Sequence, residues 1–252
     1  MKLDSRHIDV QDLQRNDIEQ MYALFVRHYE RTDRRRFESD LSNKDWVIQL
    51  LHPAHGRLCG FSTQALIRVP LGETMVHALY SGDTIVDPKF WNETALVREW
   101  GRLAVRLIES VHPEPLFWFL IAKGYKTYRF LPVFFREFYP RHDVSTPLWA
   151  REMIDALSTE MFGESYAADC GLVIAGSEKD CLRSGVADIT AGRLKDPHVR
   201  FFVQRNPNHA AGDELCCLAP LSVGNFTPAG IRLLDPDQRP APAAPRRELS
   251  TR

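Results

Sequence analysis

The strongest constraint on the fold is a double change of hydrophobic period between residues 74 and 121. Residues 74–87 alternate as an extended strand, and residues 96–111 then carry apolar side chains at steps of three and four, the spacing of one helix face. The segment His112-Pro113-Glu114-Pro115 ends that helix, and residues 116–121 follow as a run that is apolar on both faces. A strand, a helix and a buried strand in this order predict a parallel crossover.

Strands and helices are also expected before this unit. Residues 46–51 and 59–69 have extended patterns, and turn residues at 53–56 and 70–73 join them to the next strand. These three strands predict an antiparallel meander. Earlier in the chain, residues 17–29 have helical spacing, the charged residues 30–36 predict a loop, and residues 37–41 predict a short helical piece.

The pattern after the buried strand is more mixed. Residues 125–139 have helical spacing with Pro132 inside, and Thr146 is expected to cap a helix that Gly163 stops. Strands are expected at 171–175, 199–204 and 215–218. We therefore expect the α/β (α+β) class, with one domain over residues 1–234 (core 10–140, elaborated part 141–234) and a disordered tail over 235–252.

Composition excludes several classes of function. The formal net charge of -1 gives no field that would attract nucleic acid or an anionic membrane, so a small-molecule partner is expected. The five cysteines form no C-x-x-C pair, and the charged N-terminus has no apolar signal segment, which favours the cytoplasm. No run reaches the roughly 20 apolar residues of a membrane span. His52 and His55 have no cysteine or carboxylate nearby in sequence, so no metal site is expected.

Three local stretches resemble the GNAT superfamily of acyl-CoA-dependent acyltransferases. Leu58-Cys59-Gly60-Phe61-Ser62-Thr63 resembles the third strand of that family, and Ile85-Val86-Asp87-Pro88-Lys89-Phe90 resembles the end of its fourth strand. Residues 118–139 resemble the fifth strand and the aromatic helix after it. The resemblance implies a mixed, mainly antiparallel sheet flanked by helices, in which the fourth and fifth strands run parallel and splay apart around a thioester.

The resemblance also implies an activity and a cofactor. The expected reaction is transfer of an acyl group from acetyl-CoA, or another acyl thioester, to a small amine or hydroxyl acceptor in specialised metabolism. The stretch that resembles the pyrophosphate loop, Phe90-Trp91-Asn92-Glu93-Thr94-Ala95-Leu96, contains no glycine. Two donors therefore stay open: CoA bound in a modified way, or phosphopantetheine on an acyl carrier protein. The expected cofactor-binding residues are Ile85, Val86, Asn92, Thr94, Ala95, Lys126 and Arg129.

Acyl transfer needs a base for the attacking amine and an acid for the leaving thiolate. Strand alternation predicts that His77 and Asp83 share a face, and Gly82 between them marks a bulge or a close backbone approach. Asp83 or His77 is the expected base. Tyr125 and Tyr128, after the buried strand, are the candidate acids.

Two alternatives to acyl transfer remain open from the sequence. The chain may be read as a repurposed GNAT-like module that binds a small molecule or a protein partner, because its loop lacks glycine. The second alternative is another reaction on a carrier-bound intermediate, such as decarboxylation or cyclisation, in the same cleft.

Overall fold

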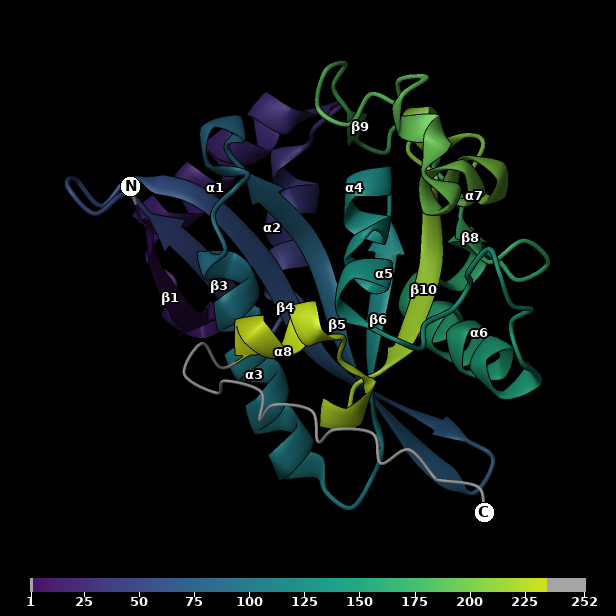
Figure 1. The fold of residues 1–252 in the computed structure, drawn as a ribbon. Helices are drawn as coiled ribbons and strands as arrows, with labels where there is room; N and C mark the ends of the chain where they lie inside the picture. The colour runs from purple at the N-terminus through teal and green to yellow at the C-terminus, as the bar shows by residue number, and fades with distance from the viewer. Residues whose placement is uncertain (1, 235–252) are drawn as a thin grey trace, which may run out of the picture.

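The computed structural model describes residues 2–234, and the tail expected at 235–252 lies outside the described residues. The chain forms a mixed eight-stranded sheet with helices on both faces (Figure 1). The strands of this sheet are β1 Asp4–Asp9, β3 Trp46–Leu51, β4 Leu58–Leu71, β5 Thr74–Val86, β6 Leu116–Ala122, β7 Tyr166–Ala167, β8 Leu172–Val173 and β10 Glu214–Pro220. Two short strands, β2 Tyr29–Glu30 and β9 Cys181–Leu182, pair separately.

The order of strands across the sheet is β1-β3-β4-β5-β6-β10-β8-β7. Every neighbouring pair is antiparallel except β5 and β6, which run parallel. The expected meander of β3, β4 and β5 and the expected parallel crossover are both confirmed. Strands from the elaborated C-terminal part extend the same sheet beyond β6, which makes β6 a central strand and explains its apolar character on both faces.

The helices divide between the two faces of the sheet according to the clusters in which their apolar side chains are buried. Helices α3 to α5 and α7 pack on one face, and α1, α2 and α6 pack on the other. Their bounds are α1 Arg15–His28, α2 Arg34–Ser42, α3 Ala95–Val111, α4 Tyr125–Tyr128, α5 Phe130–Phe134, α6 Leu148–Phe162, α7 Pro197–Arg205 and α8 Pro228–Leu234.

A β-bulge interrupts β5 where it leaves the centre of the sheet. Gly82 and Asp83 together lie opposite a single residue of β4, Thr63. One extra residue reverses the alternation of side chains beyond it. Leu79 and Ile85 are six residues apart and would face the same side of a regular strand. Leu79, before the bulge, instead packs in the hydrophobic cluster that contains α3, and Ile85, after the bulge, packs in the cluster that contains α1 on the other face.

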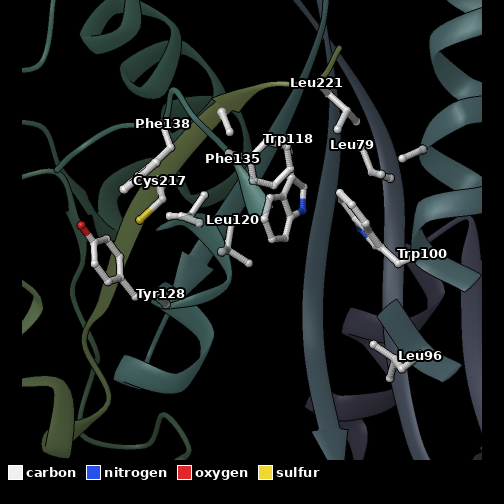
Figure 2. Close-up of a cluster of buried hydrophobic side chains, with 14 of the residues drawn as sticks. Leu79, Leu96, Trp100, Trp118, Leu120, Tyr128, Phe135, Phe138, Cys217 and Leu221 are labelled. Atoms are coloured by element: carbon white, nitrogen blue, oxygen red, sulfur yellow. The ribbon is translucent and has the colours of Figure 1, made fainter. Parts of the chain in front are cut away.

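The parallel pair separates next to this bulge. Pairing between the two strands ends at Ser81 and Leu120, while β5 continues to Val86 without β6 beside it. The Nε1 atoms of Trp100 and Trp118 both donate hydrogen bonds to Ser81 Oγ, at 3.3 and 2.9 Å. Their rings lie in the hydrophobic core on the face of the sheet that α3 covers (Figure 2). The expected splay of two parallel strands is therefore confirmed, and its starting point is fixed by buried hydrogen bonds.

Four expectations from the sequence are wrong in detail. Helix α2 begins at Arg34, inside the expected loop, because the Asp33 carboxylate caps it by accepting a hydrogen bond from Arg36 N at 2.7 Å. Residues 199–204 form part of helix α7 and not a strand. Asp196 caps that helix and Pro197 occupies its first position, a start signal that the strand prediction passed over.

The helix expected over 125–139 is replaced by two short helices and an extended segment. Helix α5 ends at Phe134, and Phe135 and Tyr139 then form isolated bridges to Phe226 and Leu218. These partners are far away in sequence, so helical spacing of the aromatic residues could not indicate the bridges. Helix α6 starts after Pro147, whose backbone stands at the cap position expected for Thr146.

Replacing Gly82 with alanine tests the bulge. A Cβ atom at this position would lie 2.6 Å from Thr63 Oγ1 and 3.0 Å from Lys44 Cε, so Gly82→Ala should lower the free energy of unfolding by about 1–3 kcal/mol. Chemical denaturation measures this loss. Gly224→Ala is the matched control, because a Cβ there meets no atom within 4 Å. Equal stability of the two variants would contradict the close approach at Gly82.

Candidate functional site

A cavity of about 590 Å³ opens where β5 and β6 separate, on the sheet face that α1, α2 and α6 cover. Its wall carries more negative than positive groups. The carboxylates are Asp33, Asp40, Asp83, Glu178, Asp180 and Glu214, and the cations are Arg36, Lys123 and Lys179. A volume of this size is typical of sites for small molecules and cofactors.

Asp83 is the half-buried carboxylate of this cavity that has no partner. It forms no ion pair and no side-chain hydrogen bond with any residue in the range 2–234. Burial, followed by the negative charges of Asp40 and Asp180, raises the pKa of Asp83 to about 7 against the opposing effect of Lys123 and Lys44. A carboxyl group with this pKa exchanges protons readily at neutral pH, as a general base must.

Three other carboxylates of the site are paired with lysine side chains. Lys123 follows β6 directly, and its Nζ binds the Asp180 carboxylate and lies 3.8 Å from Glu214. Burial alone would lower the pKa of Lys123, but Glu214, Tyr29 and Asp180 outweigh it and the pKa is raised. The remaining pairs are Lys179 with Glu214 at 2.5 Å and, at the exposed rim, Lys44 with Asp40 at 2.6 Å. The three lysines are therefore held in place by their partners.

Aromatic side chains form much of the wall on the side of α1 and α2. Phe25 and Tyr29 stack with ring centroids 4.6 Å apart, and Phe37 packs against Phe25 at 5.2 Å. Burial raises the pKa of Tyr29 and of Tyr80, so both phenols stay protonated. These rings exclude water from the side of the cavity next to Asp83, which explains why burial dominates the pKa of that carboxyl.

The structure places His77 far from this cavity. His77 pairs with Leu116 at the start of β6, and its Nδ1 lies 2.9 Å from Glu114 Oε2, whereas Asp83 lies beyond the last paired residue of β5. The expectation that His77 and Asp83 share a face is wrong, because the bulge between them reverses the alternation.

Tyr125 and Tyr128, the candidate acids, are packed in the core on the opposite face of the sheet. Tyr125 is 4% exposed and Tyr128 is fully buried, and neither lines the cavity. The hydroxyl of Tyr128 donates a hydrogen bond to Pro140 O at 2.9 Å, and burial raises its pKa (Figure 2 shows the ring at the edge of the core). The structure brings neither hydroxyl to Asp83.

The expected cofactor residues near the end of β5 take several roles. Ile85 is buried in the cluster of α1, and the backbone oxygen of Val86 accepts a hydrogen bond from Trp91 Nε1 at 2.8 Å. Asn92 is exposed. Thr94 stands at the N-cap of α3 without a side-chain capping bond, and Ala95 is the buried first residue of that helix. None of these five residues lines the cavity, although Thr84, directly before Ile85, does.

Lys126 and Arg129 are already bound by later parts of the chain. Lys126 Nζ donates a hydrogen bond to Val186 O at 2.6 Å and lies 3.4 Å from the centroid of the Trp91 ring. Arg129 forms an ion pair with Asp196 at 3.2 Å. The two cations that were expected to contact a phosphate or carboxylate thus hold the elaborated C-terminal part against α4.

Sequence reasoning missed Lys123, Asp180 and Tyr29. The sequence did indicate Lys123, because it is a polar residue directly after a buried parallel strand. Ligands of such sheets bind at the carboxyl ends of the strands. Tyr29 was assigned to the apolar stripe of the first helix. Asp180 had no local signal, since it reaches the site only through a long-range ion pair with Lys123.

Comparisons with known proteins give a distant structural likeness. No family model matches the chain, and no curated protein matches it. Solved acyltransferases, one of them described as a GNAT family N-acetyltransferase, are among the structures that resemble it. The parallel pair of β5 and β6 expected from the sequence is seen in the sheet of this chain itself.

Three of the similar structures illustrate the likeness. A GNAT family N-acetyltransferase from Escherichia coli, in complex with CoA, is 12% identical with a TM-score of 0.36, over 49% of this chain and 64% of that one. A probable N-acyltransferase from Enterococcus faecalis is 14% identical with a TM-score of 0.40, over 84% and 64%. An aminoglycoside acetyltransferase from a soil metagenome, in complex with sisomicin, is 15% identical with a TM-score of 0.37, over 57% and 96%.

The likeness to these structures is limited. The chain spans 64% of the length of each of the first two, and TM-scores below 0.5 at this identity carry no conclusion about family, substrate or cofactor. Within residues 2–234, no helix has the length and apolar character needed to cross a membrane. No group of three or more potential metal ligands is assembled in that range.

The raised pKa of Asp83 predicts a pH-dependent stability. A carboxyl whose pKa is higher in the folded state favours folding at acid pH, and this contribution is lost as the pH rises through about 7. Asp83→Asn should therefore raise the free energy of unfolding at pH 8, by on the order of 2–4 kcal/mol, and change it little near pH 4. Denaturant titrations at both pH values measure the difference.

Asp143→Asn is the control with the opposite sign. Its hydrogen bonds from Arg141 lower the pKa of Asp143 to about 2, so ionised Asp143 favours folding above the unfolded pKa and this variant should not gain stability at pH 8. A stability gain of Asp83→Asn that is equally large at pH 4 and pH 8 would contradict the assigned ionisation.

Proposed function

We propose that the protein transfers an acyl group from a thioester to an amine, with Asp83 as the general base. The observation that carries this proposal is the unpaired, half-buried Asp83 carboxylate, at the point where two parallel strands separate beside a cavity. Its pKa of about 7 suits proton abstraction at neutral pH. A cytoplasmic location and a role in specialised metabolism stay predictions from the sequence.

The reaction balances without a redox partner. The amine nitrogen attacks the thioester carbonyl carbon, the new C–N bond forms, and the C–S bond breaks. An acceptor that binds as an ammonium first releases one proton to solvent, which frees the nitrogen lone pair. Asp83 then accepts the second proton that the nitrogen loses on attack and passes it to the thiolate, which leaves as the free thiol. Because a thiol has a pKa of about 8.5, its thiolate is a good leaving group and needs little help from an acid.

The donor is held through its pantetheine arm and not through nucleotide phosphates. Beyond Ser81, the edge of β5 that faces β6 has no strand partner, so its backbone N–H and C=O groups before Val86 O, which Trp91 Nε1 already binds, can pair with the amides of such an arm. Lys126 and Arg129, in contrast, are engaged by Val186 and Asp196. Either CoA or an acyl carrier protein presents the arm that this edge fits.

Exchanging Asp83 for asparagine tests the general base. The amide keeps the shape of the carboxylate but accepts no proton, so kcat for aminolysis of an acyl thioester should fall about 10²- to 10⁴-fold. In the unmodified protein, kcat/KM should rise with pH and level off above about 7. Asp143→Asn, an exposed site paired with Arg141, should retain full activity. An active Asp83→Asn enzyme with an unchanged pH profile would rule out this role.

A comparison of donors tests how the thioester is held. Each charge-assisted hydrogen bond to a phosphate contributes about 1.5–3 kcal/mol, so a nucleotide-binding enzyme should prefer acetyl-CoA over acetyl-pantetheine by well over 100-fold. We expect kcat/KM values for the two donors within about tenfold of each other in steady-state assays. Lys126→Ala should leave that ratio unchanged. A strong preference for acetyl-CoA that Lys126→Ala abolishes would show that the nucleotide is bound.

A further inference from the structure

We propose that the acceptor is an amphipathic amine with one ammonium group and an apolar body, and that the cavity holds the ammonium at Asp83 and the body between α6 and β8. This inference rests on the proposed function for the direction of the reaction. It adds the class of acceptor, which neither the sequence nor the similar structures assign.

The cavity extends across four adjacent strands. Its wall includes Asp83 on β5, Ile121 on β6, Glu214 on β10 and Val173 on β8. Neighbouring strands lie about 4.8 Å apart, so the three intervals from β5 to β8 span roughly 14 Å. A molecule that fills this length has two ends in different surroundings.

The end at β5 needs a single positive charge. Three inner carboxylates face two lysines there, and two of the three are ion-paired, which leaves the charge of Asp83 without a counter-ion. The paired groups are Asp180 with Lys123, and Glu214 with Lys179. The other charged groups of the wall, Asp33, Arg36, Glu178 and the Lys44-paired Asp40, are exposed at its rim and are screened by solvent. One ammonium group therefore completes the charge balance.

The end at β8 is apolar. Ile121, Met161, Phe162 and Val173 line it and belong to the hydrophobic cluster between α6 and the sheet, and Ile174 adds a side chain that is 43% exposed. A second ammonium group at this end would lose its hydration and gain no carboxylate in return. A hydrocarbon or aromatic body would instead be stabilised by the apolar area that it buries, at about 25 cal/mol per Å².

The ammonium at Asp83 couples binding to pH. Below pH 7 the Asp83 carboxyl is mostly protonated, so binding of a cation must release that proton, and affinity should rise almost tenfold per pH unit up to about 7. The charged groups that act on the pKa of Asp83 are Asp40 in α2, Lys44 after it, Lys123 after β6 and Asp180 before β9. Tyr29 from β2, Tyr80 from β5, Glu214 from β10 and Lys179 line the same cavity.

Calorimetric titration without any acyl donor tests the inference separately from the reaction. We expect n-octylamine to bind at least about tenfold more tightly than 1-octanol, which lacks the charge, and than 1,8-diaminooctane, which places a second charge at the apolar end. Asp83→Asn should weaken the binding of n-octylamine and remove its pH dependence between pH 5 and 7. Equal affinity for the diamine or for the alcohol would overturn the inference.

A second pair of variants tests the apolar end. Ile174→Lys places a charge in the wall near β8 and should weaken n-octylamine binding about tenfold, whereas Val144→Lys, at an exposed apolar residue outside the cavity wall, should not. Equal effects of the two variants would overturn the assignment of that end. If n-octylamine binds as expected but no thioester acylates it, the proposed acyl transfer fails and the assigned binding site stands. If n-octylamine is acylated but binds no more tightly than 1-octanol or 1,8-diaminooctane, only the inference about the acceptor fails.

Discussion

The site depends on one extra residue in the central strand of the sheet. Without the bulge at Gly82 and Asp83, alternation would direct Asp83 to the face of α3, into the same core as Leu79. Gly82 permits the bulge because its missing Cβ leaves room for Thr63. The bulge turns the Asp83 carboxylate toward the cavity. It also lies directly after Ser81, where the pairing of β5 with β6 ends, so the carboxylate stands beside the unpaired edge of β5.

The charges around Asp83 show how the elaborated C-terminal part contributes to the site. Lys179 and Asp180, neighbours in sequence, pair with Glu214 on β10 and with Lys123 after β6. These ion pairs neutralise the Asp180 and Glu214 carboxylates, which leaves the charge of Asp83 unbalanced. Removing one partner of a buried pair costs more than the pair itself contributes, so these pairs fix the arrangement around Asp83.

Local sequence patterns predicted the helices and strands that have strong periodicity. The geometry of the site depends on contacts between residues far apart in sequence, which local patterns do not indicate. The helix Ala95–Val111 and the strand Leu116–Ala122 follow from strong periodicity, and Gly82 correctly indicated a bulge. The direction of Asp83 did not follow, because counting alternate residues requires the register with β4. Partners such as Asp180 for Lys123 lie 57 residues away in sequence, and no local pattern records such a pairing.

The central claim is that the fold holds Asp83 unpaired at the edge of the cavity, with a pKa near neutrality. Carbon-13 NMR of protein labelled at the aspartate carboxyl groups measures this ionisation directly, and Asp83→Asn assigns the resonance. We predict a titration midpoint of about 7 for Asp83. A midpoint near 4, the value of an exposed aspartate, would show that the carboxylate is solvated or paired and would contradict the account.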